Sequence, residues 1–80
     1  MKISYYPDVD YLHIRLRDET KGSVAGEDVA PGVVLLTDDE GTAVEIEIEA
    51  ASSRLDLSSL EIEDLPVSVT RKAPRESKAS

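Results

Sequence analysis

The chain has one histidine, and its surroundings are the first place where the residue types could support chemistry. His13 lies in the stretch YLHIRLR, residues 11–17. A histidine can serve as an acid–base catalyst, a metal ligand or a pH sensor. The strict alternation of residues 11–17 is instead typical of a strand that presents His13 on its polar face. No cysteine is present and no serine stands in a nucleophile-elbow pattern, so the sequence predicts no catalytic residue.

Two groups of carboxylates could also do chemistry. Asp8 and Asp10 flank Val9 directly after Pro7, and paired carboxylates perform acid–base work in glycosidases. That work requires a cleft around the substrate, which so short a chain offers poorly. We therefore expect these aspartates to accept local backbone hydrogen bonds in a turn.

The second group is the alternating run TAVEIEIE, residues 42–49. A strand lines Glu45, Glu47 and Glu49 along one face, where a straight row does not converge on a cation. The DDEG segment, residues 38–41, lacks the ligand spacing of a calcium loop. The sequence thus predicts no metal site and no cofactor.

We expect electrostatic pairing for these glutamates instead. If residues 11–17 lie beside residues 42–49, within one chain or across a dimer, Arg15 and Arg17 can pair with Glu45 or Glu47. Each such cross-strand pair contributes about 0.2–1 kcal/mol.

The elements that position these residues follow from the hydrophobic period. Period-2 alternation or continuous apolar runs predict strands at residues 2–6, 11–17, 33–38 and 42–49, with weaker edge strands within 23–32 and at 64–69. Residues 50–61 lose this period and predict a short helical segment. We therefore predict a mainly β fold at the margin of α+β. It is a single antiparallel β-meander of about five strands, with the helical segment near residues 50–61 covering one face.

One face of this sheet is predicted to be apolar and is the candidate interaction face. It carries Ile3, Tyr5, Leu12, Ile14, Leu16, Val44, Ile46 and Ile48. A single sheet exposes such a face unless another layer covers it. The leucines of residues 55–60 offer one lid and a second copy of the chain offers another. Small domains without disulfides often gain stability by associating, so we predict a homodimer.

Charge separates the chain into two parts. Residues 1–70, predicted to form the single domain, hold five basic and sixteen acidic residues, a net charge of −11. Residues 71–80, RKAPRESKAS, form a basic tail that we predict to be disordered. The acidic body disfavours nucleic acid and favours a basic partner, if there is one. No signal-peptide core and no apolar run of membrane-spanning length occurs, which predicts a cytoplasmic protein without membrane contact.

Several spaced features resemble the bacterial Domain of Unknown Function 2283 family. They are the opening MKISYYPDVDYLHIRLRD, with its Tyr-x-Pro-x-x-Asp turn, and the later VAPGVVLLTDDEGTAVEIEIEAASSRLDL, together covering roughly residues 1–57. The resemblance implies no established activity, cofactor or catalytic residue. It does imply a possible antitoxin-like role, because some members are encoded beside small toxin-like proteins of ribonuclease-related fold.

Three functions follow in order of preference. The first is a non-enzymatic small domain that acts through protein association, beginning with itself. The second is an antitoxin-like acidic partner that binds and masks a small basic ribonuclease-type toxin. The third, an enzyme using His13 with Asp8 or Asp10, ranks last because no nucleophile or cleft accompanies the histidine.

Overall fold

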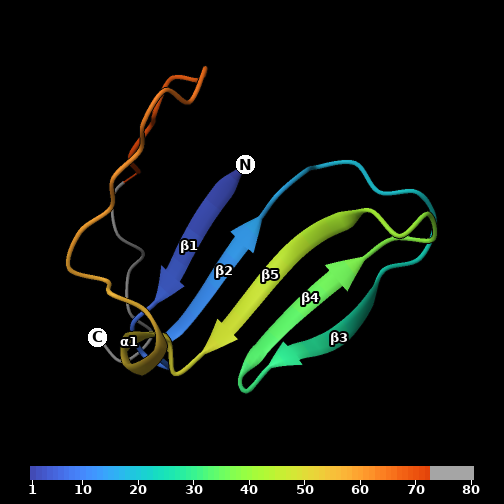
Figure 1. Ribbon diagram of the computed structural model, residues 1–80, viewed down its shortest axis with the longest axis horizontal. Coiled ribbons are helices and arrows are strands. Elements are labelled where there is room, and N and C mark those ends of the chain that lie inside the picture. The colour runs from blue at the N-terminus through green and yellow to red at the C-terminus, as the bar shows by residue number, and fades with distance from the viewer. Residues whose placement is uncertain (73–80) are drawn as a thin grey trace.

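The computed structural model describes residues 1–72, which form one open antiparallel sheet and one short helix (Figure 1). The elements are β1 (Lys2–Tyr6), β2 (Tyr11–Arg15), β3 (Ala25–Ala30), β4 (Val33–Thr37), β5 (Ala43–Glu49) and α1 (Ala51–Arg54). The spatial order is β1-β2-β5-β4-β3. The mainly β prediction is therefore confirmed, and β2 lies next to the central strand β5 within one chain.

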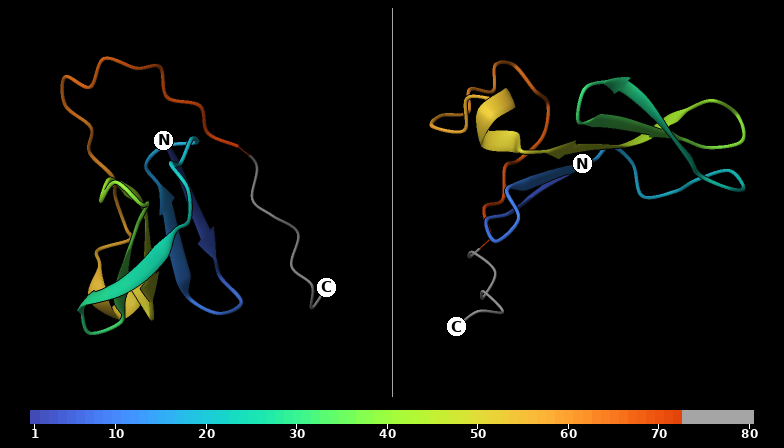
Figure 2. Two further views of the ribbon diagram at one scale, coloured as in Figure 1. Left: turned by 90° about the vertical axis from the view of Figure 1, so that its right-hand side faces the viewer. Right: turned by 90° about the horizontal axis from the view of Figure 1, so that it is seen from below.

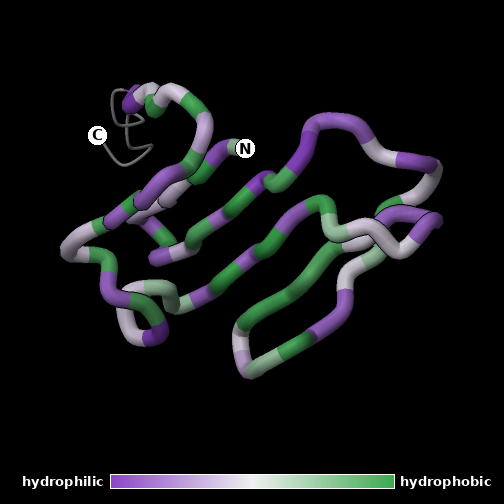
Figure 3. The backbone as a smooth tube through the Cα atoms, turned by 45° about the horizontal axis from the view of Figure 1, so that its top comes forward, coloured by the Kyte–Doolittle hydropathy of each residue, from purple (hydrophilic) through white to green (hydrophobic). Residues whose placement is uncertain are grey.

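The strands form where the sequence alternates, and their register sorts the side chains onto two faces. Leu12 lies opposite Ile48 and Ile14 opposite Ile46, whereas His13 lies opposite Glu47 on the other face. Figure 3 shows this alternation along β2 and β5, and a continuous hydrophobic colour along β4. The apolar strand β4 therefore places hydrophobic side chains on both faces.

Two tight turns join strands β3, β4 and β5. Gly32 has a φ of 72°, a left-handed conformation that favours glycine, in the turn after Pro31. In the turn before β5, the buried Asp38 carboxylate accepts hydrogen bonds from the backbone N–H groups of Lys21, Glu40 and Thr42. This aspartate thereby ties the long connection after β2 to the β4–β5 turn.

A second aspartate ties the β1–β2 turn to the helix. Asp10 accepts a 2.7 Å hydrogen bond from the Tyr5 hydroxyl, and further hydrogen bonds from the N–H and hydroxyl groups of Ser52. Its backbone carbonyl accepts the N–H of Ala51. The helix consequently begins above the β1–β2 turn, at one end of the sheet.

The helix covers only this end of the apolar face. Ala51 is fully buried against Leu12 and Ile48, with Ile14, Val33 and Ile46 partly buried around them. Every residue from 52 to 72 is exposed. The helix lies within the predicted segment near residues 50–61, but the leucines of residues 55–60 are exposed and do not form the expected lid. Figure 2 shows α1 standing over one end of the sheet.

The chain after α1 adds no further strand within the described residues. Residues 64–69, expected to form an edge strand, are irregular, and Pro66 lacks the N–H that a sheet ladder needs. This segment runs on the β1 side of the molecule (Figure 1). Of the predicted tail, residues 73–80 lie outside the described residues. Within residues 1–72, no helix combines the length and apolar character needed to cross a membrane.

Candidate functional site

The polar face of the neighbouring strands β2 and β5 gathers the chain's histidine with two glutamates. His13 Nε2 lies 2.7 Å from Glu45 Oε2 and 3.9 Å from Glu47 Oε2. We call these three residues, with Tyr11 and Arg15, the β2–β5 polar cluster. The strand twist makes β2 side chains reach diagonally, so that His13 contacts Glu45 more closely than its direct partner Glu47.

Two further side chains hold the outer carboxylate oxygens of the cluster. The Tyr11 hydroxyl donates a 2.5 Å hydrogen bond to Glu47 Oε1. Arg15 Nη2 lies 3.3 Å from Glu45 Oε1. Each glutamate therefore has one oxygen held by a neighbouring β2 side chain, and presents its other oxygen to His13.

The cluster is partly withdrawn from water. Glu45 as a residue is only 8% exposed, an unusual position for a carboxylate on a single-layer sheet. In the sheet register it lies between Arg15 on β2 and the half-buried Leu36 on β4. Its neighbour Glu47 lies between His13 and Val34 in the same way. Apolar side chains of β4 thus flank one side of the cluster.

The pKa values respond to this arrangement. The close contact with His13 lowers the pKa of Glu45, against the opposing effect of burial, and Arg15 lowers it further. Burial raises the pKa of Tyr11 to about 12, and its hydrogen bond to Glu47 acts in the same direction. At neutral pH the cluster therefore contains an ionised Glu45 and a neutral tyrosine donor.

Of the two arginines predicted to pair with the glutamates, only Arg15 does so in the structure. Arg15 reaches Glu45, whereas Arg17 lies beyond the end of β2, where its charge helps to lower the pKa of Asp38. Among residues 1–72, the ion pairs of Glu45 and Glu47 are made by His13 and Arg15. Sequence reasoning did not include Tyr11 or His13 in this network. The expected pairing of residues 11–17 with residues 42–49 could have identified them, because it places Tyr11 and His13 on the same face as the glutamates.

The predicted interaction face divides along the sheet. Leu12, Val44 and Ile48 are buried, and Ile14, Leu16 and Ile46 are half-buried. On the edge strand β1, Ile3 is 52% and Tyr5 39% exposed. The apolar face is therefore closed under α1 and open along its edge strand β1.

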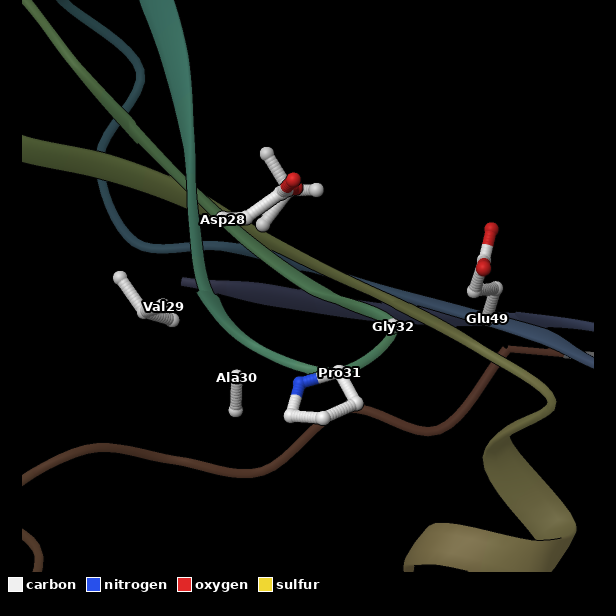
Figure 4. A pocket seen from close by; sticks show the side chains of 7 residues that line it. Asp28, Val29, Ala30, Pro31, Gly32 and Glu49 are labelled. Atoms are coloured by element: carbon white, nitrogen blue, oxygen red, sulfur yellow. The ribbon is translucent and has the colours of Figure 1, made fainter.

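Two depressions mark the surface of the described residues. One lies beside the polar cluster and is lined by Lys2, Ser4, Tyr6, His13, Arg15 and Asp18. The other surrounds the β3–β4 turn, with Asp28 and Glu49 among its lining residues. Figure 4 shows these two carboxylates projecting from different strands without converging. Of the two depressions, only the first adjoins the polar cluster.

These features define a class of small, single-layer β-sheet proteins with a polar cluster on one face and an open apolar surface on the other. The family model described as protein of unknown function (DUF2283) matches residues 2–52, and the chain belongs to this family. The matched region contains all five strands and ends at Ser52, which bonds to Asp10. No curated protein and no solved structure matches the chain.

Proposed function

We propose that this chain functions through protein association, and that its first partner is a second copy of itself. The observation that carries the proposal is the open edge of the apolar face along β1. Ile3 and Tyr5 are exposed there, although both lie in register with core positions of β2, opposite Ile14 and Leu12.

The small hydrophobic core supports the proposal that a second copy adds a layer to the sheet. Within the described residues, no large side chain is fully buried, and the buried apolar residues are Leu12, Val44, Ile48 and Ala51.

A second copy fits the face by chemistry and by shape. The open surface consists of apolar side chains on a sheet, and two such sheets can pack face to face about 10 Å apart. The strongly acidic copies avoid direct repulsion in this arrangement because Glu45, Glu47 and Glu49 lie on the opposite face. A two-fold axis would let each copy supply the missing layer of the other.

Sedimentation analysis with a pair of matched variants tests this role. Ile3→Lys places a charge on the apolar face, whereas Val9→Lys places the same charge at an exposed apolar residue in the β1–β2 turn. We expect a dimer at micromolar concentration. We expect Ile3→Lys to weaken it about tenfold or more, as a buried unpaired charge should, and Val9→Lys to leave it intact.

Two results would overturn the homodimer. The first is a wild-type chain that stays monomeric at all accessible concentrations. The second is equal weakening by Ile3→Lys and Val9→Lys. Circular dichroism of both variants establishes that each retains its strands before the comparison is made.

A second candidate role is an antitoxin-like one, in which the acidic body masks a small basic toxin. It is favoured by the net charge of −11 over residues 1–70. Binding would then weaken steeply with added salt, because exposed charges are screened. Co-purification of the chain with the product of a neighbouring gene, and rescue of growth on co-expression, tests this role. Absence of complex formation with any neighbouring product would count against it.

A further inference from the structure

We propose that His13, Glu45 and Glu47 form a binding site for a divalent transition-metal ion, with Zn²⁺ as the reference ion. One donor atom from each residue lies within 4.8 Å of the others. The three residues come from β2 and β5, two neighbouring inner strands, so a regular sheet rather than a loop positions them.

The donor separations are close to those of a metal centre. Zn²⁺ binds imidazole nitrogen and carboxylate oxygen at about 2.0–2.2 Å, which places its donors about 3–3.6 Å from one another. His13 Nε2 lies 2.7 Å from the Glu45 oxygen and 3.9 Å from the Glu47 oxygen. These two distances lie on either side of the required range, and all three donors lie within 4.8 Å of one another, so we infer that side-chain rotations can bring them to one ion.

The histidine nitrogen supplies an observation that is independent of the acidic row. His13 Nε2 is enclosed by its surroundings and, among the described residues, is the buried side-chain polar atom that lacks a hydrogen-bond partner. Its close partners among the described residues are Glu45 Oε2 at 2.7 Å and Glu47 Oε2 at 3.9 Å. A ring nitrogen that faces two carboxylate oxygens at these distances is a favourable position for metal coordination.

Outer contacts already orient the two carboxylates. Tyr11 holds Glu47 Oε1, and Arg15 holds Glu45 Oε1, so both Oε2 atoms face the histidine. Such contacts fix metal ligands in place, and their loss commonly lowers metal affinity about 10–100-fold. Tyr11 and Arg15 are therefore positioning residues in this proposal.

The donor types select the class of ion. One imidazole with two carboxylates suits Zn²⁺, Mn²⁺ or Fe²⁺, whereas Mg²⁺ and Ca²⁺ prefer all-oxygen sites. Three protein donors also leave a coordination position for water. The adjacent depression, lined in part by His13 and Arg15, provides access from solvent.

Calorimetric titration of the full chain, prepared without a histidine tag, with ZnCl₂ tests the site. We expect one ion per chain for the wild type. We expect affinity to fall about tenfold or more in His13→Gln and in Glu47→Gln, and also in Tyr11→Phe, which removes only the outer contact. Glu49→Gln is the matched control because it removes a charge from the same row but outside the cluster.

A second readout uses the fact that His13 is the only histidine. Long-range ¹H–¹⁵N spectra of its ring should show Nε2 shifting on addition of Zn²⁺, in wild type and in Glu49→Gln. The proposal fails if Zn²⁺ does not bind at a one-to-one ratio, if Nε2 does not respond, or if Glu49→Gln weakens binding as much as Glu47→Gln. Circular dichroism of each variant separates loss of the site from loss of the fold.

Discussion

The two faces of the sheet differ in how far their side chains find contacts within one chain. On the polar face, Tyr11, His13 and Arg15 each meet a glutamate of β5 within the same chain. On the apolar face, Ala51 packs on Leu12 and Ile48, while Ile3 stays exposed at the edge. Polar pairing needs only two neighbouring strands, whereas apolar burial needs a whole second layer. One chain of this length completes the first but not the second.

The largest effect should come from the closed end of the apolar face. Leu12→Ala removes a buried side chain and should lower the free energy of unfolding by about 2–5 kcal/mol. Ile3→Ala should cost about 0.5 kcal/mol or less in the dilute monomer, because surface substitutions change stability little. Urea unfolding at low protein concentration measures both. Equal losses would show that the two parts of the face are equally buried.

The next effect concerns the anchor of α1 at that closed end. Arg54 donates to the Glu49 carbonyl and lies against Gly32, where an added Cβ would come within 2.5 Å of its guanidinium. Gly32→Ala should therefore be more destabilising than the about 1–2 kcal/mol of left-handed strain alone.

Gly41→Ala provides the control for this prediction. Gly41 has a φ of 77°, and a Cβ added at this position would meet open space, so its substitution measures strain without the contact. Thermal unfolding of the two variants gives the comparison. If Gly41→Ala cost as much as Gly32→Ala, packing of Arg54 on the turn would contribute nothing.

On the polar face, Tyr11→Phe should have a smaller effect. The variant leaves Glu47 without its hydroxyl donor and should cost about 1–2 kcal/mol. A double-mutant cycle with Glu47→Gln isolates the contact, since residues that touch give non-additive effects. Strictly additive losses would argue that the polar face gains no coupling from this hydrogen bond.

The smallest expected effect is a pH dependence on the acid side. Burial raises the pKa of Asp38, but the backbone N–H groups of Lys21, Thr42 and Glu40 outweigh it, and the net result is a pKa below the ordinary value of 3.8. A carboxyl with a lowered folded-state pKa contributes stability above its unfolded pKa and loses that contribution as the pH falls through the folded value.

Acid titration of stability checks this sign. The wild-type free energy of unfolding should fall as the pH drops below about 4, and the Asp38→Asn variant should show a shallower fall. An equally steep fall in the variant would assign the acid sensitivity to other carboxyl groups. Asp10 is one such group, because Tyr5 and Ser52 lower its pKa.

Much of the fold could be predicted because strand alternation is a local property. The pattern of Leu12, Ile14, Ile46 and Ile48 identified the apolar face without any knowledge of strand order. The β3–β4 turn followed from Pro31-Gly32, whose backbone preferences are equally local. The short helix was predicted near residues 50–61 and lies within that range, at Ala51–Arg54. The lid expected from the leucines of residues 55–60 is absent, because these leucines indicate apolar character but carry no information about what they contact.

The polar cluster could not be predicted from the pattern of residues along a single strand. Considered along one strand, Glu45 and Glu47 form a straight row with no third ligand. The β2–β5 register brings in His13, and the strand twist brings it diagonally onto Glu45. Neither the strand register nor the strand twist can be predicted from the residues of one strand alone.

The sequence by itself determined the strands, the sorting of side chains onto two faces and the family of the chain, because period and turn chemistry are set by neighbouring residues. The tertiary structure decided which strands meet, and so which side chains share a site. It placed β5 beside β2 as well as beside β4, and it left the residues from 52 to 72 exposed. These outcomes depend on long-range packing, in which one strand order brings the polar side chains of β2 and β5 together and leaves an apolar face open.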